Sequence, residues 1–130
     1  MAVPVVALYG SLNALFNLYL ANNVSNARKK HKVSLGTREN KDVELAMRIH
    51  GNNAEFIPLA LVMLLIAELQ GLSAMWLHVL GGALLIGRML HAYGMPKPAP
   101  NFGRFTGVAT TWITIAATSV WILVMRFKGS

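Results

Sequence analysis

Long apolar stretches alternate with short polar segments along the whole chain. The apolar stretches run from about 3–26, 43–70, 74–93 and 104–127. Each has roughly the ~20 residues that a helix needs to cross ~30 Å of hydrocarbon. Unpaired backbone groups are not tolerated in lipid, and the strictly alternating pattern of membrane strands is missing, which favours helices. We expect an all-α integral membrane four-helix bundle that forms a single domain over residues 1–130.

The basic residues indicate how the bundle is oriented. Residues 27–42 carry six Lys or Arg, and Lys97 and Arg104 lie between the third and fourth stretches, whereas the C-terminal tail has only Arg126 and Lys128. By the positive-inside rule, the first and third connections face the cytoplasm and both termini face outside. The basic run after the first stretch, with none before it, is typical of a retained helix rather than a signal peptide.

Composition agrees with a membrane protein. The 130 residues are 55% hydrophobic and only 13% charged, with a mean hydropathy of +0.48. The net charge of +7 would suggest a nucleic-acid partner in a soluble chain. Here it follows membrane topology, so we expect no nucleic acid. The chain has no cysteine, which excludes disulfides, thiolate metal sites and a cysteine nucleophile. The histidines form no metal set with nearby carboxylates, so no metal site is expected.

Polar residues in the second stretch form the strongest candidate site. Arg48, Asn52 and Glu55 are spaced i, i+4, i+7, and Glu44 extends the row over ~16 Å of helix. Charged groups inside a membrane usually face a protein interior or a water-filled cavity and are often functional. The row therefore predicts the wall of a pocket that opens to the cytoplasm.

Other polar groups fall at the same predicted depth. They are Arg88, His91 and Tyr93 in or after the third stretch, Arg104 at the start of the fourth, and Arg28 at the end of the first. Several arginines with few carboxylates suit a small zwitterionic anion, because guanidinium groups bind carboxylates bidentately. Alternatively, Arg48 and Glu55 form a structural ion pair, and Arg28 and Arg104 extend only to lipid phosphates.

Three further groups of polar residues have simpler structural interpretations. His91 alone is more often a packed, hydrogen-bonded histidine than a catalyst. Asn13 and Asn17 are expected to join helices by hydrogen bonds. Glu68 and His78 lie near the outer interface and are expected to be solvated.

The second stretch resembles the family of membrane-associated proteins in eicosanoid and glutathione metabolism (MAPEG). Its residues match most of the E-R-x-x-R-A-x-x-N-x-x-E-x-x-P signature, through Glu44, Arg48, Asn52, Glu55 and Pro58. Ala27-Arg28, Gly87-Arg88-Met-Leu-His91 and Arg104 resemble motifs in the other three helices. Leu45 stands where the signature has its first arginine, and Gly51 stands where some relatives have another basic residue. The tyrosine pair spaced by four in the third helix of eukaryotic members is not reproduced, because His91 and Tyr93 are only two residues apart.

This resemblance implies a function and an assembly. Such proteins are homotrimers that bind glutathione, as co-substrate, between adjacent subunits near the cytoplasmic face. Carried over, the glutathione-binding residues would be Arg28, Arg48, Asn52, Glu55, Arg88, His91 and Tyr93, and Arg104 would be catalytic by stabilising the thiolate. The small bacterial members are the most similar, so the bacterial inner membrane is the expected location.

Three functions remain open from the sequence. The leading one is a transferase or peroxidase-like enzyme that joins glutathione to a small lipophilic electrophile arriving through the membrane lipids. The second is a glutathione- or lipid-binding scaffold of the same fold without catalysis. The third is a transporter, which is disfavoured because residues 59–67 are purely apolar, whereas a pathway needs polar groups through the full membrane depth.

Overall fold

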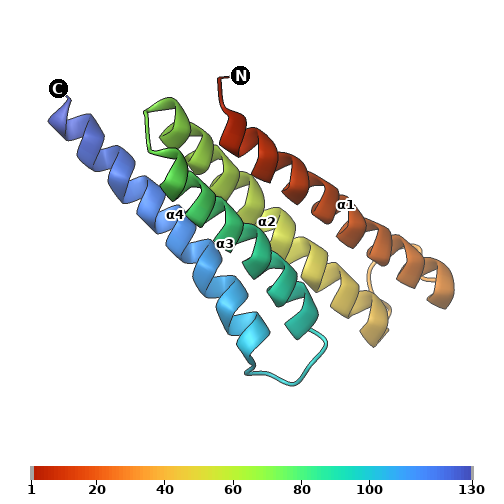
Figure 1. Ribbon diagram of the computed structural model, residues 1–130. Helices are drawn as coiled ribbons and strands as arrows, with labels where there is room; N and C mark the ends of the chain where they lie inside the picture. The colour runs from red at the N-terminus through yellow and green to blue at the C-terminus, as the bar shows by residue number, and fades with distance from the viewer. Residues whose placement is uncertain (1, 130) are drawn as a thin grey trace.

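Four long α-helices make up the computed structural model, which describes residues 2–129 (Figure 1). They are α1 (Pro4–His31), α2 (Lys41–Leu69), α3 (Ala74–Gly94) and α4 (Phe102–Lys128). The helices run up and down, so the two termini lie at the same end of the bundle as the α2–α3 turn. The other two connections lie at the opposite end. No strand occurs within the described residues, and the all-α four-helix fold is confirmed.

The helix ends differ slightly from the predicted ones, and capping explains the differences. α1 ends at His31 rather than near residue 26, because its basic last turn interacts favourably with the negative end of the helix dipole. It stops where Lys32 adopts a left-handed conformation with φ of 56°. α4 begins at Phe102 rather than at residue 104, because the Asn101 side chain accepts a hydrogen bond from the Arg104 amide.

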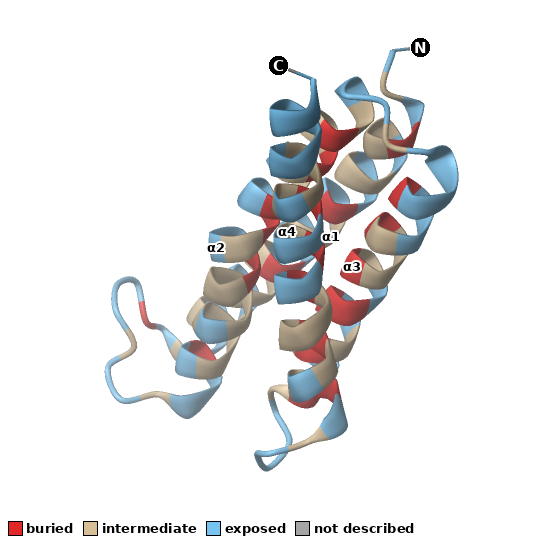
Figure 2. Cartoon of the chain, turned by 90° about the vertical axis from the view of Figure 1, so that its left-hand side faces the viewer, coloured by how far each residue is buried: buried red, intermediate tan, exposed pale blue. Residues whose placement is uncertain are grey.

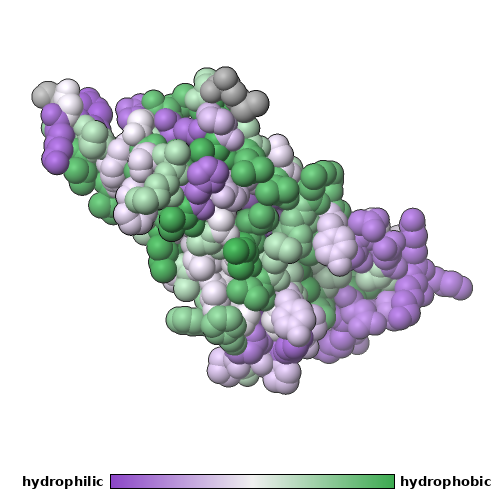
Figure 3. Space-filling model, in the orientation of Figure 1, coloured by the Kyte–Doolittle hydropathy of each residue, from purple (hydrophilic) through white to green (hydrophobic). Residues whose placement is uncertain are grey.

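All four helices are long enough and apolar enough to cross a membrane. Figure 2 shows that the buried residues gather on the faces the helices turn toward one another. Large apolar side chains such as Leu15, Leu18 and Trp112 are about two-thirds exposed on the outside, at 66%, 65% and 60%. Figure 3 shows this apolar surface between hydrophilic ends. The chain is therefore a multi-pass integral membrane protein. The side on which its termini lie stays a prediction.

The closest helix pair is α3 with α4, and glycines make the approach possible. A Cβ atom on Gly103 would lie 2.5 Å from the Leu90 carbonyl oxygen, and one on Gly107 would lie 2.6 Å from that of Gly87. Small residues of this kind let membrane helices pack backbone to backbone. The buried threonines that continue the face donate their hydroxyls to carbonyl groups of α4 itself, so they need no partner across the interface.

The end of the bundle that holds the termini is closed by side chains. The Glu68 carboxylate accepts hydrogen bonds from the amides of Val5 (2.9 Å) and Val6 (2.7 Å), and so caps the start of α1. A negative group is favourable there because the helix dipole is positive at that end. The expectation that Glu68 is merely solvated is wrong. His78 is exposed, yet its Nδ1 atom lies 3.0 Å from the Tyr9 hydroxyl.

Replacement of Gly107 by alanine should destabilise the bundle. The new methyl group would meet the backbones of Gly87 and His91, so α3 and α4 would have to move apart. Overpacking of this kind costs about 1–3 kcal/mol. The matched control is Gly10→Ala, because nothing lies within 4 Å of that position. We expect a lower thermal midpoint in detergent for Gly107→Ala only. Equal midpoints for the two variants would contradict the packing described.

The predicted orientation can be tested with single cysteines, because the chain has none of its own. Gln70→Cys lies at the α2–α3 turn, and Ala99→Cys lies in the α3–α4 connection at the opposite end. Both positions are exposed. In intact cells, a membrane-impermeant maleimide should label Gln70→Cys, and Ala99→Cys only after lysis. The reverse pattern would invert the topology.

Candidate functional site

A buried arginine ties three helices together in the inner part of the bundle. Arg88 of α3 is 1% exposed. Its Nε atom donates to Asn53 Oδ1 (3.1 Å) and one Nη atom donates to Asn52 Oδ1 (2.6 Å), both on α2. The other Nη atom donates to the Thr111 hydroxyl of α4 (3.2 Å). Hydrogen bonds from a charged donor are stronger than neutral ones, so this group fixes the helices relative to one another.

The same network reaches α1 through a second amide. Asn53 Nδ2 donates to Asn17 Oδ1 at 2.9 Å, so one connected set of side chains links all four helices. The prediction that Asn17 joins helices is confirmed. Asn13 does not do so, because its amide nitrogen donates to the Tyr9 carbonyl of its own helix. His91 is 4% exposed and its Nδ1 atom lies 3.5 Å from Arg88, which places it at the edge of the network.

Arg88 has no carboxylate partner among the described residues. Within residues 2–129 the ion pairs are His31–Asp42 (2.9 Å) and Lys41–Glu44 (3.8 Å), both near the α1–α2 connection. A guanidinium group in a low-dielectric interior is costly without a counter-charge, even when neutral oxygens accept its hydrogen bonds. The network therefore leaves a positive field that favours an anion nearby.

Two other predicted site residues stand exposed on α2. Arg48 and Glu55 share a face with Asn52, and neither has a side-chain partner within the described residues. The alternative of an ion pair between Arg48 and Glu55 is thus not found within the subunit. Glu55 lies ~21 Å along the helix from its start at Lys41, well inside the bilayer. Charges at such depth are expensive in contact with lipid, so this face requires a cover of protein or ligand.

Arg28 and Arg104 hold the α1–α2 and α3–α4 connections. Both connections lie at the end of the bundle opposite the termini, which we call the loop end. Arg28 donates to the carbonyl oxygens of Gly36 (2.8 Å) and Val33 (3.3 Å). Arg104 donates from one Nη atom to those of Met95 (2.5 Å) and Lys97 (3.2 Å). Both guanidinium groups turn toward protein rather than only toward lipid. The other Nη atom of Arg104 has no partner within residues 2–129, which leaves two N–H groups for a ligand.

Tyr93 lies apart from this set. Its side chain is exposed, and the Lys97 ammonium sits 3.4 Å from the centre of its ring in a cation–π contact. Of the predicted site residues, the structure of the described chain therefore brings together Asn52, Arg88 and His91.

The sequence interpretation missed Asn53 and Thr111. Asn53 follows Asn52 directly, and it is the more buried of the two. Thr111, Thr114 and Thr118 recur at helical spacing, which is the one sequence signal that could have pointed to a polar face on α4.

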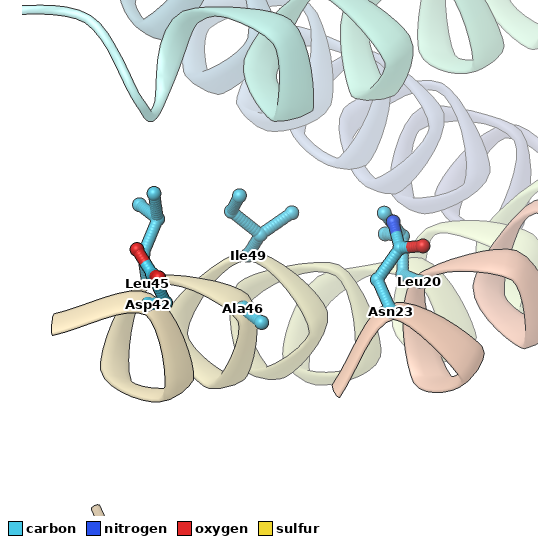
Figure 4. A pocket seen from close by; sticks show the side chains of 6 residues that line it. All are labelled: Leu20, Asn23, Asp42, Leu45, Ala46 and Ile49. Carbon is cyan, nitrogen blue, oxygen red and sulfur yellow. The ribbon is translucent and has the colours of Figure 1, made fainter. Parts of the chain in front are cut away.

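A small groove near the α1–α2 connection is a weaker candidate. Its volume is about 150 Å³. Figure 4 shows the side chains that line it, Leu20 and Asn23 of α1 and Asp42, Leu45, Ala46 and Ile49 of α2. Asp42 is already paired with His31, and the other lining side chains are mainly apolar. No cluster of three potential metal ligands occurs within the described residues. The groove thus offers less chemistry than the polar network.

Comparison with known proteins gives a consistent answer. The sequence model described as "MAPEG family" matches residues 6–124, which reach into all four helices. The "Inner membrane protein YecN" of Escherichia coli strain K12 is 34% identical over 111 residues, which cover 85% of this chain and 84% of that protein. The protein of the same name from Escherichia coli O6:H1 gives the same figures.

Loss of the Asn53 amide should weaken the whole bundle. Asn53→Leu keeps the branched shape and the number of side-chain heavy atoms but leaves one Arg88 donor and the Asn17 side-chain oxygen unpaired. We expect a loss of about 2–4 kcal/mol of unfolding free energy, because one of these bonds involves a charge. Asn22→Leu, on the exposed side of α1, is the matched control and should change little. Equal thermal midpoints for both variants in detergent would show that the network is not stabilising.

Proposed function

The chain belongs to the MAPEG family, and from this premise we propose that it is a membrane-embedded, glutathione-dependent enzyme of the transferase or peroxidase type. In the transferase reaction the thiolate sulfur of glutathione attacks an electrophilic carbon of a lipophilic molecule. A carbon–sulfur bond forms, and the bond to the leaving group breaks with its electron pair on that group. The thiol proton passes to water.

The observation that carries this proposal is the exposed pair Arg48 and Glu55, two unpaired charges at membrane depth on one face of α2. Glutathione carries two carboxylates, one ammonium group and two peptide bonds. The Arg48 guanidinium suits a carboxylate, and the Glu55 carboxylate suits the ammonium group. Asn52 lies between them, with its side-chain oxygen already held by Arg88. Its free amide nitrogen can donate to a peptide carbonyl.

We propose that three copies assemble with glutathione between adjacent subunits. A lone subunit leaves the Arg48–Glu55 face uncovered, and a neighbouring copy would cover it. The neighbour would contribute residues near the loop end, among them Arg28 and Tyr93. Arg88 and His91 are buried, so their proposed role is to position Asn52 and supply a positive field rather than to touch the peptide.

Arg104 is the proposed catalytic residue. A cation near a thiol lowers the thiol's pKa and stabilises the thiolate, which is the nucleophile. The Arg104 donors that bind the carbonyls of Met95 and Lys97 hold the side chain in place. The remaining Nη atom would then face the sulfur at no further conformational cost.

The proposed location is a bacterial inner membrane, with the glutathione site toward the cytoplasm. The name of the Escherichia coli relative, an inner membrane protein, supports this location. The loop end that carries Arg28 and Arg104 is also the end that the positive-inside rule directs to the cytoplasm.

A glutathione titration of the detergent-purified protein, followed by thiolate absorbance in the ultraviolet, tests the proposal. Arg48→Ala and Glu55→Gln should each weaken binding about 10- to 100-fold, because each removes a charge-assisted hydrogen bond. Arg104→Ala should keep binding but lose the thiolate signal. Arg126→Ala, an exposed arginine at the opposite end of the bundle, is the control and should resemble the wild type.

Each outcome has a distinct meaning. Saturable binding with no thiolate signal in the wild type would favour the non-catalytic scaffold. Unchanged affinity in both α2 variants would remove the site assignment. Absence of binding at millimolar glutathione would overturn the proposed function.

A further inference from the structure

One buried acceptor in the bundle is left without a hydrogen bond. Asn13 of α1 is 0% exposed. Its amide nitrogen donates to the Tyr9 carbonyl oxygen at 2.8 Å, which fixes the orientation of the side chain. Its Oδ1 atom has no partner within residues 2–129. Buried polar atoms are nearly always paired, so an orphaned oxygen of this kind indicates a group that is absent from the single subunit.

Asn13 lines a groove between α1 and α2. The groove has a volume of about 300 Å³, and its other walls include Ala14 and Asn17 of α1 and Ala54, Pro58 and Leu61 of α2. Ala14, Ala54 and Pro58 are exposed, so the groove is open at the side of the bundle. Apart from the two asparagines its lining is apolar. Lipid acyl chains could enter it, but they carry no N–H or O–H group for Asn13.

The groove adjoins the candidate glutathione site. Asn17 at its edge accepts a hydrogen bond from Asn53, which in turn accepts one from Arg88. Ala54 in its wall is the residue directly before Glu55. A molecule in the groove would therefore lie beside the residues proposed to hold glutathione, while remaining in reach of the bilayer.

We propose that this groove binds the lipophilic co-substrate, and that the ligand carries an O–H or N–H group that donates to Asn13 Oδ1. An amide oxygen accepts but cannot donate, so the site selects hydroxylated, phenolic or hydroperoxide-bearing lipophiles over plain hydrocarbons, halides and ethers. The binding site stands on the groove and the orphaned oxygen. Its role as a co-substrate site rests on the proposed function.

Two probes that differ by a single donor test the inference. 1-Naphthol carries a hydroxyl, and 1-methoxynaphthalene has the same rings without a donor. Equilibrium dialysis against the protein in lipid nanodiscs, corrected with empty nanodiscs, should show saturable naphthol binding. The preference for naphthol should be roughly fivefold to tenfold, the value expected for one neutral hydrogen bond. Asn13→Leu should abolish this preference, and Asn22→Leu should retain it.

A second variant keeps the test decisive if Asn13→Leu fails to fold. Ala54→Phe leaves Asn13 in place and fills the groove from its exposed wall, so saturable binding of both probes should be lost. Equal binding of the two probes to the wild type would overturn the inference. An unchanged preference for naphthol in Asn13→Leu would also overturn it. Dissociation of the oligomer in Asn13→Leu with naphthol binding intact would assign the groove to a contact between copies instead.

The outcomes separate this inference from the proposed function. Asn13→Leu should bind glutathione as the wild type does, because Asn13 has no contact with the Arg88 network. Donor-selective naphthol binding in a protein that does not bind glutathione would keep the site and remove the enzyme. Glutathione binding without donor-selective naphthol binding would keep the proposed enzyme and remove the groove as a binding site.

Discussion

The Arg88 guanidinium has to find all of its partners inside the protein, because lipid supplies none. Its four contacts reach α2, α4 and a histidine of its own helix, so the relative rotation of three helices is decided at this point. The glycines of the α3–α4 contact also serve to give Arg88 its partners. They bring the two backbones close enough for the hydroxyl of Thr111 to reach Arg88, which a larger residue at Gly107 would prevent.

The two ends of the bundle differ in how their polar side chains are paired. At the end with the termini, the Glu68 carboxylate caps α1 and the Tyr9 hydroxyl contacts His78. In the half nearer the α1–α2 and α3–α4 connections, Arg48, Glu55 and one Nη atom of Arg104 have no partner among residues 2–129. Stability alone would pair or remove them, because unpaired charge at membrane depth is costly. The cost is understandable if a ligand or a second subunit completes that half.

The length and hydropathy of the apolar stretches were sufficient to predict the four helices, because these two properties decide a membrane span. Sequence periodicity was sufficient for the shared face of Arg48, Asn52 and Glu55, which depends only on helix geometry. It could not decide that Asn53 receives Arg88 Nε, because that depends on how α2 is rotated against α3 by packing. The capping role of Glu68 was missed for the same reason. Its partners, Val5 and Val6, lie more than 60 residues away in the chain and become neighbours only in the folded bundle.

The acidic residues are too few to balance the basic ones. The chain has five of them against twelve Lys and Arg. Asp42 and Glu44 are paired near the first connection, Glu68 caps α1, and Glu39 lies exposed in a loop. Glu55 is left as the carboxylate at membrane depth on α2, and no ion pair joins it to Arg48 or Arg88 within residues 2–129. With Arg48 and Arg88 in the same half of the bundle, one carboxylate cannot balance the charge, even if a neighbouring copy brings it closer. A bound molecule with two carboxylates and one ammonium group carries a net single negative charge, so it would offset part of this excess, and its ammonium group would give Glu55 a partner.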